Sequence, residues 1–211
     1  MTEVKKMIDG KQIVTERRAV NFFDPKRELP QATLEAIINL AVLAPSAFNL
    51  QPWRIVAVKS PEAKQRLFRQ ANNQDKILEA PVTLIIIGDR SAFAAENPAW
   101  EELAAMLQDD ARLKGLQSFA KSLYGTSDER RVKFAESNAG LLAMSIMYAA
   151  KYYDVDSHPM SGIDFAGIKA EFSLKADEEA VMLIGLGYLD PAKKLFPRRK
   201  RLGYGEIVQE V

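Results

Sequence analysis

The spacing of apolar side chains predicts two long helices. Between residues 31 and 44, apolar residues recur at the interval of one helix face: Leu34, Ile37, Ile38, Ala41 and Val42. A longer pattern runs from about residue 126 to residue 152, where Thr126 and Glu129 have the spacing of a capping box. At about 1.5 Å per residue this helix is close to 40 Å long. Apolar side chains on more than one of its faces indicate burial at the centre of the domain or against a second copy of the chain.

Runs of consecutive apolar residues predict the strands. Residues 82–88 are apolar at nearly every position, which is typical of a central strand covered on both faces. Weaker runs and one alternating segment predict further strands at 54–59, from residue 155, at 181–188 and, at the C-terminus, at 205–211. Shorter helices are predicted at 3–16, from residue 61 and at 165–172. The strands and helices do not alternate as βαβ units, and no linker divides the chain, so we expect one domain over residues 1–211.

The segment 91–125 has the least regular pattern in the chain. Its bulky apolar residues are spread among charges, and Pro98 and Gly115 interrupt it, so we expect short helices. Aromatic side chains carried between core elements favour a lid over a site. A helical excursion that only covers the core is an equally open alternative.

Composition narrows the classes of function. The net charge of +1 provides no general field for nucleic acid or a membrane, and we expect neither as a partner. The absence of cysteine excludes disulfides, thiolate metal sites and a cysteine nucleophile. His158 is the single histidine, which excludes multi-histidine metal sites, and its position before a proline favours a structural role. With no signal peptide and no apolar run near the roughly 20 residues of a membrane span, we expect a cytoplasmic, soluble protein.

Several polar residues form a pattern that fits an anionic, ring-bearing ligand. Residues 45–53, P-S-A-F-N-L-Q-P-W, form a loop that two prolines make rigid between a helix and a strand. Arginines near both ends of the chain could hold a dianion, although a solvated helix end is the alternative for the first pair. Asn73 and Lys76, three residues apart, would share one face of a helical turn and suit the imide edge of a ring.

These segments resemble motifs of the nitroreductase family of flavin enzymes. Residues 17–23, R-R-A-V-N-F-F, resemble the family's R-R-S-x-R-x-F opening. Residues 45–53 match its P-S-x-x-N-x-Q-P-W loop at every defined position. Residues 159–164 resemble its P-x-x-G-[FI]-D turn, and residues 185–188 its late glycine-tyrosine strand end. The nine-residue loop is the specific match.

The resemblance implies a fold, a cofactor and a reaction. The fold would be α+β, with a mostly antiparallel sheet flanked by helices. Two chains would form an intertwined homodimer that exchanges C-terminal tails and holds FMN at the subunit interface. Hydride would pass from NADH or NADPH to flavin N5, and electrons would then pass to a nitroaromatic, a quinone or a similar small acceptor by a ping-pong mechanism. The flavin carries this chemistry, so no side-chain nucleophile is required.

The resemblance also implies the site residues. Lys76 and the Ser161 region would tune the flavin, and one of Trp100, Phe119 or Tyr124 would stack on the acceptor. Ala19 and Asn21 depart from the usual serine and cation of the first motif, which bears on affinity and redox potential. The implied contacts are the phosphate ligands Arg17, Arg18, Arg199 and Arg201, the neighbouring Ala19 and Asn21, the pyrimidine-edge residues Asn73 and Lys76, the turn residues Pro159, Met160, Ser161 and Gly162, and, from the partner subunit, Pro45, Ser46, Ala47 and Asn49.

Two other functions stay open at this point. The same fold could bind flavin without catalysing a reaction and act as a regulatory protein. The basic run at residues 197–201 could form a small nucleic-acid patch, although the near-neutral net charge argues against it.

Overall fold

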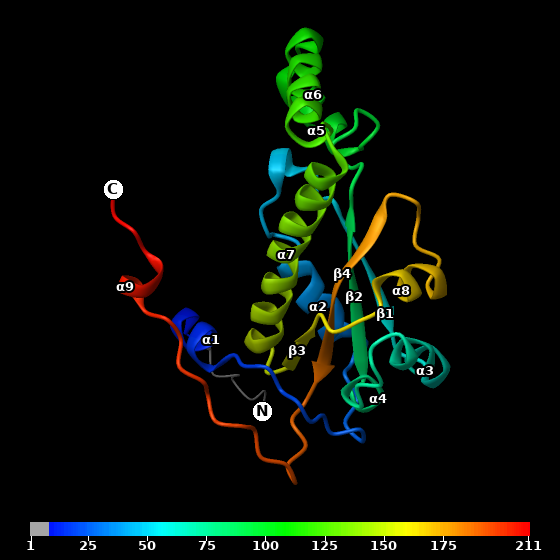
Figure 1. Ribbon diagram of the computed structural model, residues 1–211, viewed down its shortest axis with the longest axis vertical. Helices are drawn as coiled ribbons and strands as arrows, with labels where there is room; N and C mark the ends of the chain where they lie inside the picture. Colours follow the sequence, from blue (N-terminus) through cyan, green and yellow to red (C-terminus); the bar gives the residue numbers. More distant parts are fainter. Residues whose placement is uncertain (1–8) are drawn as a thin grey trace, which may run out of the picture.

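The computed structural model describes residues 9–211, and its centre is a four-stranded antiparallel sheet (Figure 1). The strand order is β1-β2-β4-β3, and all three neighbouring pairs are antiparallel. The strands are β1 (Trp53–Val58), β2 (Val82–Asp89), β3 (Asp156–Met160) and β4 (Glu178–Gly187). The predicted α+β class with a mostly antiparallel sheet is confirmed.

The apolar run at residues 82–88 becomes a central strand for the expected reason. Strand β2 lies between β1 and β4, and its first seven residues are buried. Strand β3 lies at an edge of the sheet and contains Pro159. An edge position tolerates proline, which has no N–H to donate to a neighbouring strand.

Alternate side chains of β2 reach two different helical layers. Leu84 and Ile86 pack with α2 (Gln31–Ala41) and α7 (Asp128–Tyr152) on one face of the sheet. Ile85 and Ile87 pack on the other face, where the cover is α3 (Pro61–Arg69), α4 (Lys76–Glu79) and α8 (Phe165–Glu171). Because successive strand residues point to opposite faces, one apolar run supplies both halves of the core.

Helix α7 runs the length of the sheet and is the longest helix in the described part of the chain (Figure 1). Leu142 and Ile146 are fully buried, as the apolar pattern predicts. The predicted cap residue is wrong by one position: Ser127, and not Thr126, accepts a hydrogen bond from the Arg130 N–H at 3.3 Å. Ser127 has the three-residue spacing to Arg130 that a capping side chain needs.

The segment 91–125 forms two helices that project beyond the end of the sheet where α7 begins (Figure 1). They are α5 (Ala99–Leu107) and α6 (Asp110–Tyr124), so the prediction of helices is confirmed, and α6 is longer than expected. The chain turns between them at Gln108, which has a left-handed backbone conformation. A separate aromatic cluster joins both helices to the start of α7.

The two ends of the chain differ from the prediction. The first part of the helix predicted at 3–16 lies outside the described residues, and α1 (Gly10–Glu16) begins at Gly10 under an Asp9 cap. The strand predicted at 205–211 is wrong, because this segment contains the short helix α9 (Tyr204–Ile207). The tail runs past α1 and away from the sheet, so no strand among residues 9–211 lies beside it to pair (Figure 1). No helix among the described residues is long and apolar enough to cross a membrane.

Candidate functional site

The loop at residues 45–53 is compact and strained. Ala47–Asn49 form a 3-10 turn, η1, and the Leu50 N–H donates to the Ala47 carbonyl oxygen at 3.0 Å. Phe48, Asn49 and Gln51 have φ values of 53°, 55° and 47°, in the left-handed region. Left-handed backbone costs L-residues roughly 1–2 kcal/mol each, so the rest of the protein must hold this loop in place.

Asn138 of α7 provides that hold. Its side chain is buried, and its Oδ1 accepts a hydrogen bond from the Ala47 N–H at 2.9 Å. Its Nδ2 donates to the Phe134 carbonyl oxygen at 2.7 Å, which fixes the orientation of the amide. Sequence reasoning did not identify this anchor. The available signal was an amide within the apolar stripe of a long helix.

The loop also gathers the three aromatic residues predicted for the acceptor pocket. The Phe48 ring lies 5.7 Å from that of Trp100 and 6.4 Å from those of Phe119 and Tyr124, between centroids. Trp100 is 2% exposed, and its indole N–H donates to the Ala94 carbonyl oxygen, so it packs as a core residue. Phe119 is 54% exposed and free to meet a ligand. Phe48, which occupies an undefined motif position, was not predicted.

A second group of predicted residues lies along β3. Ala19 forms an isolated parallel bridge with Ser157, and the Val20 N–H donates to the Ser157 carbonyl oxygen at 3.1 Å. This pairing brings Arg17 and Arg18 to the outer side of the edge strand. The Arg18 Nη2 donates to the Phe196 carbonyl oxygen, while its buried Nε has no hydrogen-bond partner among residues 9–211.

The other end of β3 connects to the segment around Lys76. Asn72 and Gln74 donate side-chain hydrogen bonds to the Gly162 carbonyl oxygen at 3.0 Å and 3.1 Å. The Lys76 Nζ donates to Gln74 Oε1 at 3.3 Å, which joins Lys76 to the same network. Asn72 and Gln74 were not predicted, although they flank a predicted residue in the sequence.

The expected shared helical face of Asn73 and Lys76 is wrong. Asn73 lies in a turn with φ of 53°, and helix α4 begins only at Lys76. Asn and Asp adopt this left-handed conformation more readily than other residues with a side chain, which explains a turn where a helix was expected. The two residues therefore reach this region from different local structures.

His158 is a residue of β3, and the charge of Lys76 at the start of α4 acts on it. Burial and the positive charge of Lys76 lower the pKa of His158 to about 4, and a backbone hydrogen bond with Val20 acts in the opposite direction. The imidazole is therefore neutral near pH 7. Its Nδ1 is buried without a hydrogen-bond partner in the described part of the chain.

The remaining predicted contacts have distinct positions. Pro159 is half-buried, and the Met160 side chain is buried in the core, so this pair can offer a ligand mainly backbone. Arg199 and Arg201 are exposed on the tail, and the Arg201 Nη1 donates to the Arg199 carbonyl oxygen. The tail residue that reaches α1 is Arg198, whose Nη2 donates to the Glu16 carbonyl oxygen at 2.7 Å. Asn21 is half-buried.

The donors along β3 suit an elongated ligand with a phosphate at one end and a ring at the other. Arg17 and the unused Nε of Arg18 provide charged donors at the first end. Lys76 supplies a cation at the second end, where no described acceptor takes the Gly162 N–H. This donor set fits FMN, whose phosphate is an anion and whose ring edge accepts hydrogen bonds.

The 45–53 loop and the β3 group, which consists of Arg17, Arg18, Lys76 and Gly162, lie at opposite edges of the sheet within one chain. The loop leads into β1 at one edge of the sheet, and the β3 group lies at the other edge (Figure 1). Strands β2 and β4 separate these edges, and three strand spacings amount to about 14 Å. The two groups are therefore separate surfaces of one chain.

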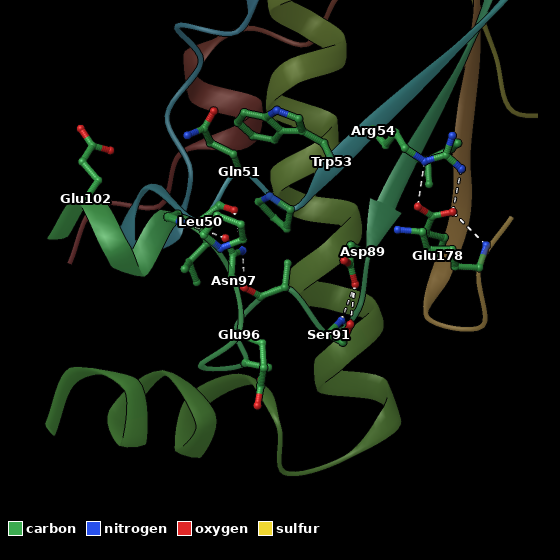
Figure 2. Close-up of a pocket in the computed structure, with 17 residues that line it drawn as sticks. Leu50, Gln51, Trp53, Arg54, Asp89, Ser91, Glu96, Asn97, Glu102 and Glu178 are labelled. Carbon is green, nitrogen blue, oxygen red and sulfur yellow. Dashed lines mark hydrogen bonds and ion pairs between the residues drawn. The ribbon is translucent and has the colours of Figure 1, made fainter. Parts of the chain in front are cut away.

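A cavity of about 850 Å³ lies on the other side of the loop, between Trp53, Asn97 and Glu178 (Figure 2). The Arg54 guanidinium donates to the two carboxylate oxygens of Glu178 at 2.8 Å and 2.7 Å. Asp89 accepts hydrogen bonds from the backbone N–H and the hydroxyl of Ser91. These charges are satisfied inside the protein. None of the predicted cofactor contacts lines this cavity, so its size alone does not make it the site.

Known proteins resemble this chain in sequence and in fold. Residues 14–188 match the sequence model described as the nitroreductase family. A Thermus thermophilus protein named NADH dehydrogenase is 29% identical over 194 residues, which cover 92% of each chain. The crystal structure of Bacillus subtilis ydfN superposes with a TM-score of 0.88 at 28% identity and covers 95% of this chain and 98% of that one.

A further solved structure contains the cofactor itself. An Exiguobacterium sibiricum protein in complex with FMN has a TM-score of 0.81 at 23% identity, over 97% of this chain and 98% of that one. At this identity the likeness concerns the fold. The family match spans most of the chain, including the 45–53 loop and β3, and the chain therefore belongs to the nitroreductase family.

Proposed function

We propose that this protein is a homodimeric, FMN-dependent oxidoreductase that takes electrons from NADH or NADPH. The observation that carries the proposal is the pair of half-sites at opposite edges of one sheet. One half has the cationic donors Arg17, Arg18 and Lys76, and the other is the strained loop that Asn138 anchors. Family membership and a relative named NADH dehydrogenase support the electron donor.

Each group of residues has a role in this proposal. Arg17 and Arg18, with Arg199 and Arg201 from the tail, bind the FMN phosphate through charge-assisted hydrogen bonds. Lys76 and Asn73 would hold the pyrimidine edge of the ring, and the Gly162 N–H would donate to the flavin near N5. Pro45, Ser46, Ala47 and Asn49 of the second subunit cover the ring and the ribityl chain. Ala19, Asn21, Pro159, Met160 and Ser161 complete the wall.

Bound FMN supplies the two-step transfer of electrons from the nicotinamide to a nitroaromatic or quinone acceptor by a ping-pong mechanism. The residues of this chain orient the reactants and exclude water. Phe119 and Tyr124, packed around Phe48, form the surface on which a planar acceptor stacks. A neutral His158 keeps a second positive charge away from Lys76 near pH 7. A cytoplasmic location stays a prediction.

An anaerobic titration of the purified protein tests the proposal. We expect a yellow protein with one FMN per chain, whose flavin absorbance is bleached by NADH or NADPH. A nitroaromatic or a quinone should then restore the absorbance, and the comparison of the two nucleotides shows which donor is preferred. A colourless protein that does not take up FMN would contradict the proposal, and a yellow protein that neither nucleotide bleaches would indicate a flavin-binding protein without this activity.

A further inference from the structure

A small cavity lies beside the anchored loop, between the end of α6 and the first turns of α7. Its volume is about 230 Å³. Tyr124 and Phe134 form an aromatic wall, with ring centroids 4.5 Å apart. The lining residues are Ala47, Tyr124, Arg130, Lys133, Phe134, Ser137 and Asn138.

The cavity has two chemically different ends. Asn138 marks the first end, where it holds the backbone of Ala47. Arg130 and Lys133 lie on the same side of α7, closer to its start. At 1.5 Å per residue, Lys133 is about 7.5 Å and Arg130 about 12 Å along the helix axis from Asn138. A molecule with its ring against the loop could place an anionic group between these cations.

Neither cation has an ion-pair partner in the described part of the chain. The side chains of Arg130 and Lys133 form no ion pair or hydrogen bond within residues 9–211, and both residues are exposed. Arg131, one position further on, pairs with Asp177 at 2.6 Å and Asp128 at 3.6 Å. Glu129 and Glu136 lie in an adjoining cleft and form no ion pair with Lys133.

The position of Arg130 in the first turn of α7 also requires an explanation. A cation near a helix N-terminus opposes the macrodipole and costs stability. Arg130 and Lys133 are thus two cations without ion-pair partners that both line an aromatic cavity at the loop. A ligand with a negative charge would pair with both cations and offset the unfavourable position of Arg130.

We propose that Arg130 and Lys133 bind the anionic group of the substrate that reacts beside the 45–53 loop. The inference rests on the proposed function, because the loop must cover the flavin of the second subunit. The ligand is a planar ring that carries a phosphate or a carboxylate. The phosphates of NAD(P)H and the carboxylate of an acidic acceptor share this chemistry.

The test compares a double variant with a control of equal net charge. Arg130→Gln/Lys133→Gln removes both cations, and Arg112→Gln/Lys26→Gln removes two exposed cations that do not line the cavity. The dissociation constant of NADH is measured from the rate of flavin reduction without oxygen. The KM values of 4-nitrobenzoate and neutral 4-nitrobenzamide are measured with saturating NADH. Binding of benzoate to the oxidised protein is followed by the flavin spectrum and provides a readout without turnover.

We expect the double variant to weaken anion binding roughly five- to tenfold at low salt, and less at high salt. A higher NADH constant assigns the pair to the nucleotide phosphates. A higher KM for 4-nitrobenzoate, without a change for 4-nitrobenzamide, and weaker benzoate binding assign it to the acceptor.

If all of these values match those of the control while FMN is retained and reduced, the inference is overturned and the proposed function stands. If FMN is not bound or not reduced in the unmodified protein, the proposed function and the inference both fail. The single variant Lys133→Gln repeats the comparison if the double variant has a lower melting temperature than the control.

Discussion

The buried side chain of Asn138 holds the 45–53 loop in its conformation. Its amide satisfies the Ala47 N–H and the Phe134 carbonyl oxygen, and the loop beyond it contains three residues in left-handed conformations. The motif at residues 45–53 specifies the loop residues. The anchor comes from a helix 91 positions away and is visible only in the fold.

Replacing Asn138 with leucine tests this anchor. We expect Asn138→Leu to lower the free energy of unfolding by about 1–3 kcal/mol, because the Ala47 N–H loses its partner. FMN affinity should fall as well, since the loop is no longer held. Urea denaturation and FMN fluorescence titration measure the two effects. The exposed Asn39→Leu on α2 should change stability by less than about 0.5 kcal/mol, and equal behaviour of the two variants would refute the anchor.

His158 predicts a pH dependence of stability. The folded protein holds the pKa of His158 at about 4, whereas an unfolded histidine titrates near pH 6.5. Between these values the unfolded state binds more protons, so stability falls as the pH drops from 6.5 toward 4. After allowance for partial solvent screening, we expect a loss of about 1–2 kcal/mol.

The comparison with His158→Gln isolates this contribution from that of the carboxyl groups. Urea denaturation at pH 6.5, 5.5 and 4.5 should show the extra loss in the unmodified protein alone. Parallel curves for the two proteins would mean that His158 is accessible to solvent and titrates normally.

At the scale of elements, the ion pair between Arg54 and Glu178 joins the start of β1 to the start of β4 across β2. The Arg54 hydrogen bonds lower the pKa of Glu178, and those of Glu178 raise the pKa of Arg54. The Glu178 side chain is 6% exposed and also accepts a hydrogen bond from the Lys175 N–H, whereas Arg54 is 42% exposed.

Removing one partner should therefore cost more than removing both. Arg54→Met leaves a buried carboxylate, and we expect it to lower stability at pH 7 by about 2 kcal/mol after solvent screening. Arg54→Met/Glu178→Met should recover part of this loss. The benefit of the pair should also vanish as the pH falls through the lowered pKa of Glu178, below its ordinary range. Chemical denaturation of the single and double variants measures this, and additive losses would contradict it.

The sequence predicts elements well where their own residues determine them. The apolar run of β2 and the periodicity of α2 appear in the structure because burial follows directly from the pattern. The predicted C-terminal strand is wrong because a strand requires a neighbouring strand, and the described part of the chain places none beside the tail. The shift from Thr126 to Ser127 at the start of α7 depends on the path of the chain before the helix.

The candidate site, like the fold, can be predicted from the sequence only in part. The motifs identify both groups of residues, and the fold brings Arg17, Arg18, Lys76 and Gly162 to β3. Phe48, Asn72 and Gln74 occupy positions where the motifs tolerate many residues, so only their contacts reveal them.

At the scale of the whole molecule, the proposed function requires that two chains share each FMN site. The loop and the β3 group lie at opposite edges of one sheet. In the proposed dimer, each subunit would contribute the loop to one site and the β3 group to the other. Symmetric dimers with isologous interfaces supply both sites at once. The exposed tail residues Phe196, Leu202, Tyr204 and Ile207 are consistent with a surface that a second copy covers.

Mixing two defective variants tests this central claim most directly. Arg18→Ala/Lys76→Ala damages only the β3 half, and Pro45→Trp obstructs only the loop half without altering the Asn138 hydrogen bond. Each variant alone should bind little FMN. After the two are unfolded together and refolded, half of the dimers are mixed, and one site in each combines two intact halves. We predict recovery of about a quarter of the FMN bound by the unmodified protein, whereas no recovery above the separate variants would contradict a site shared between subunits.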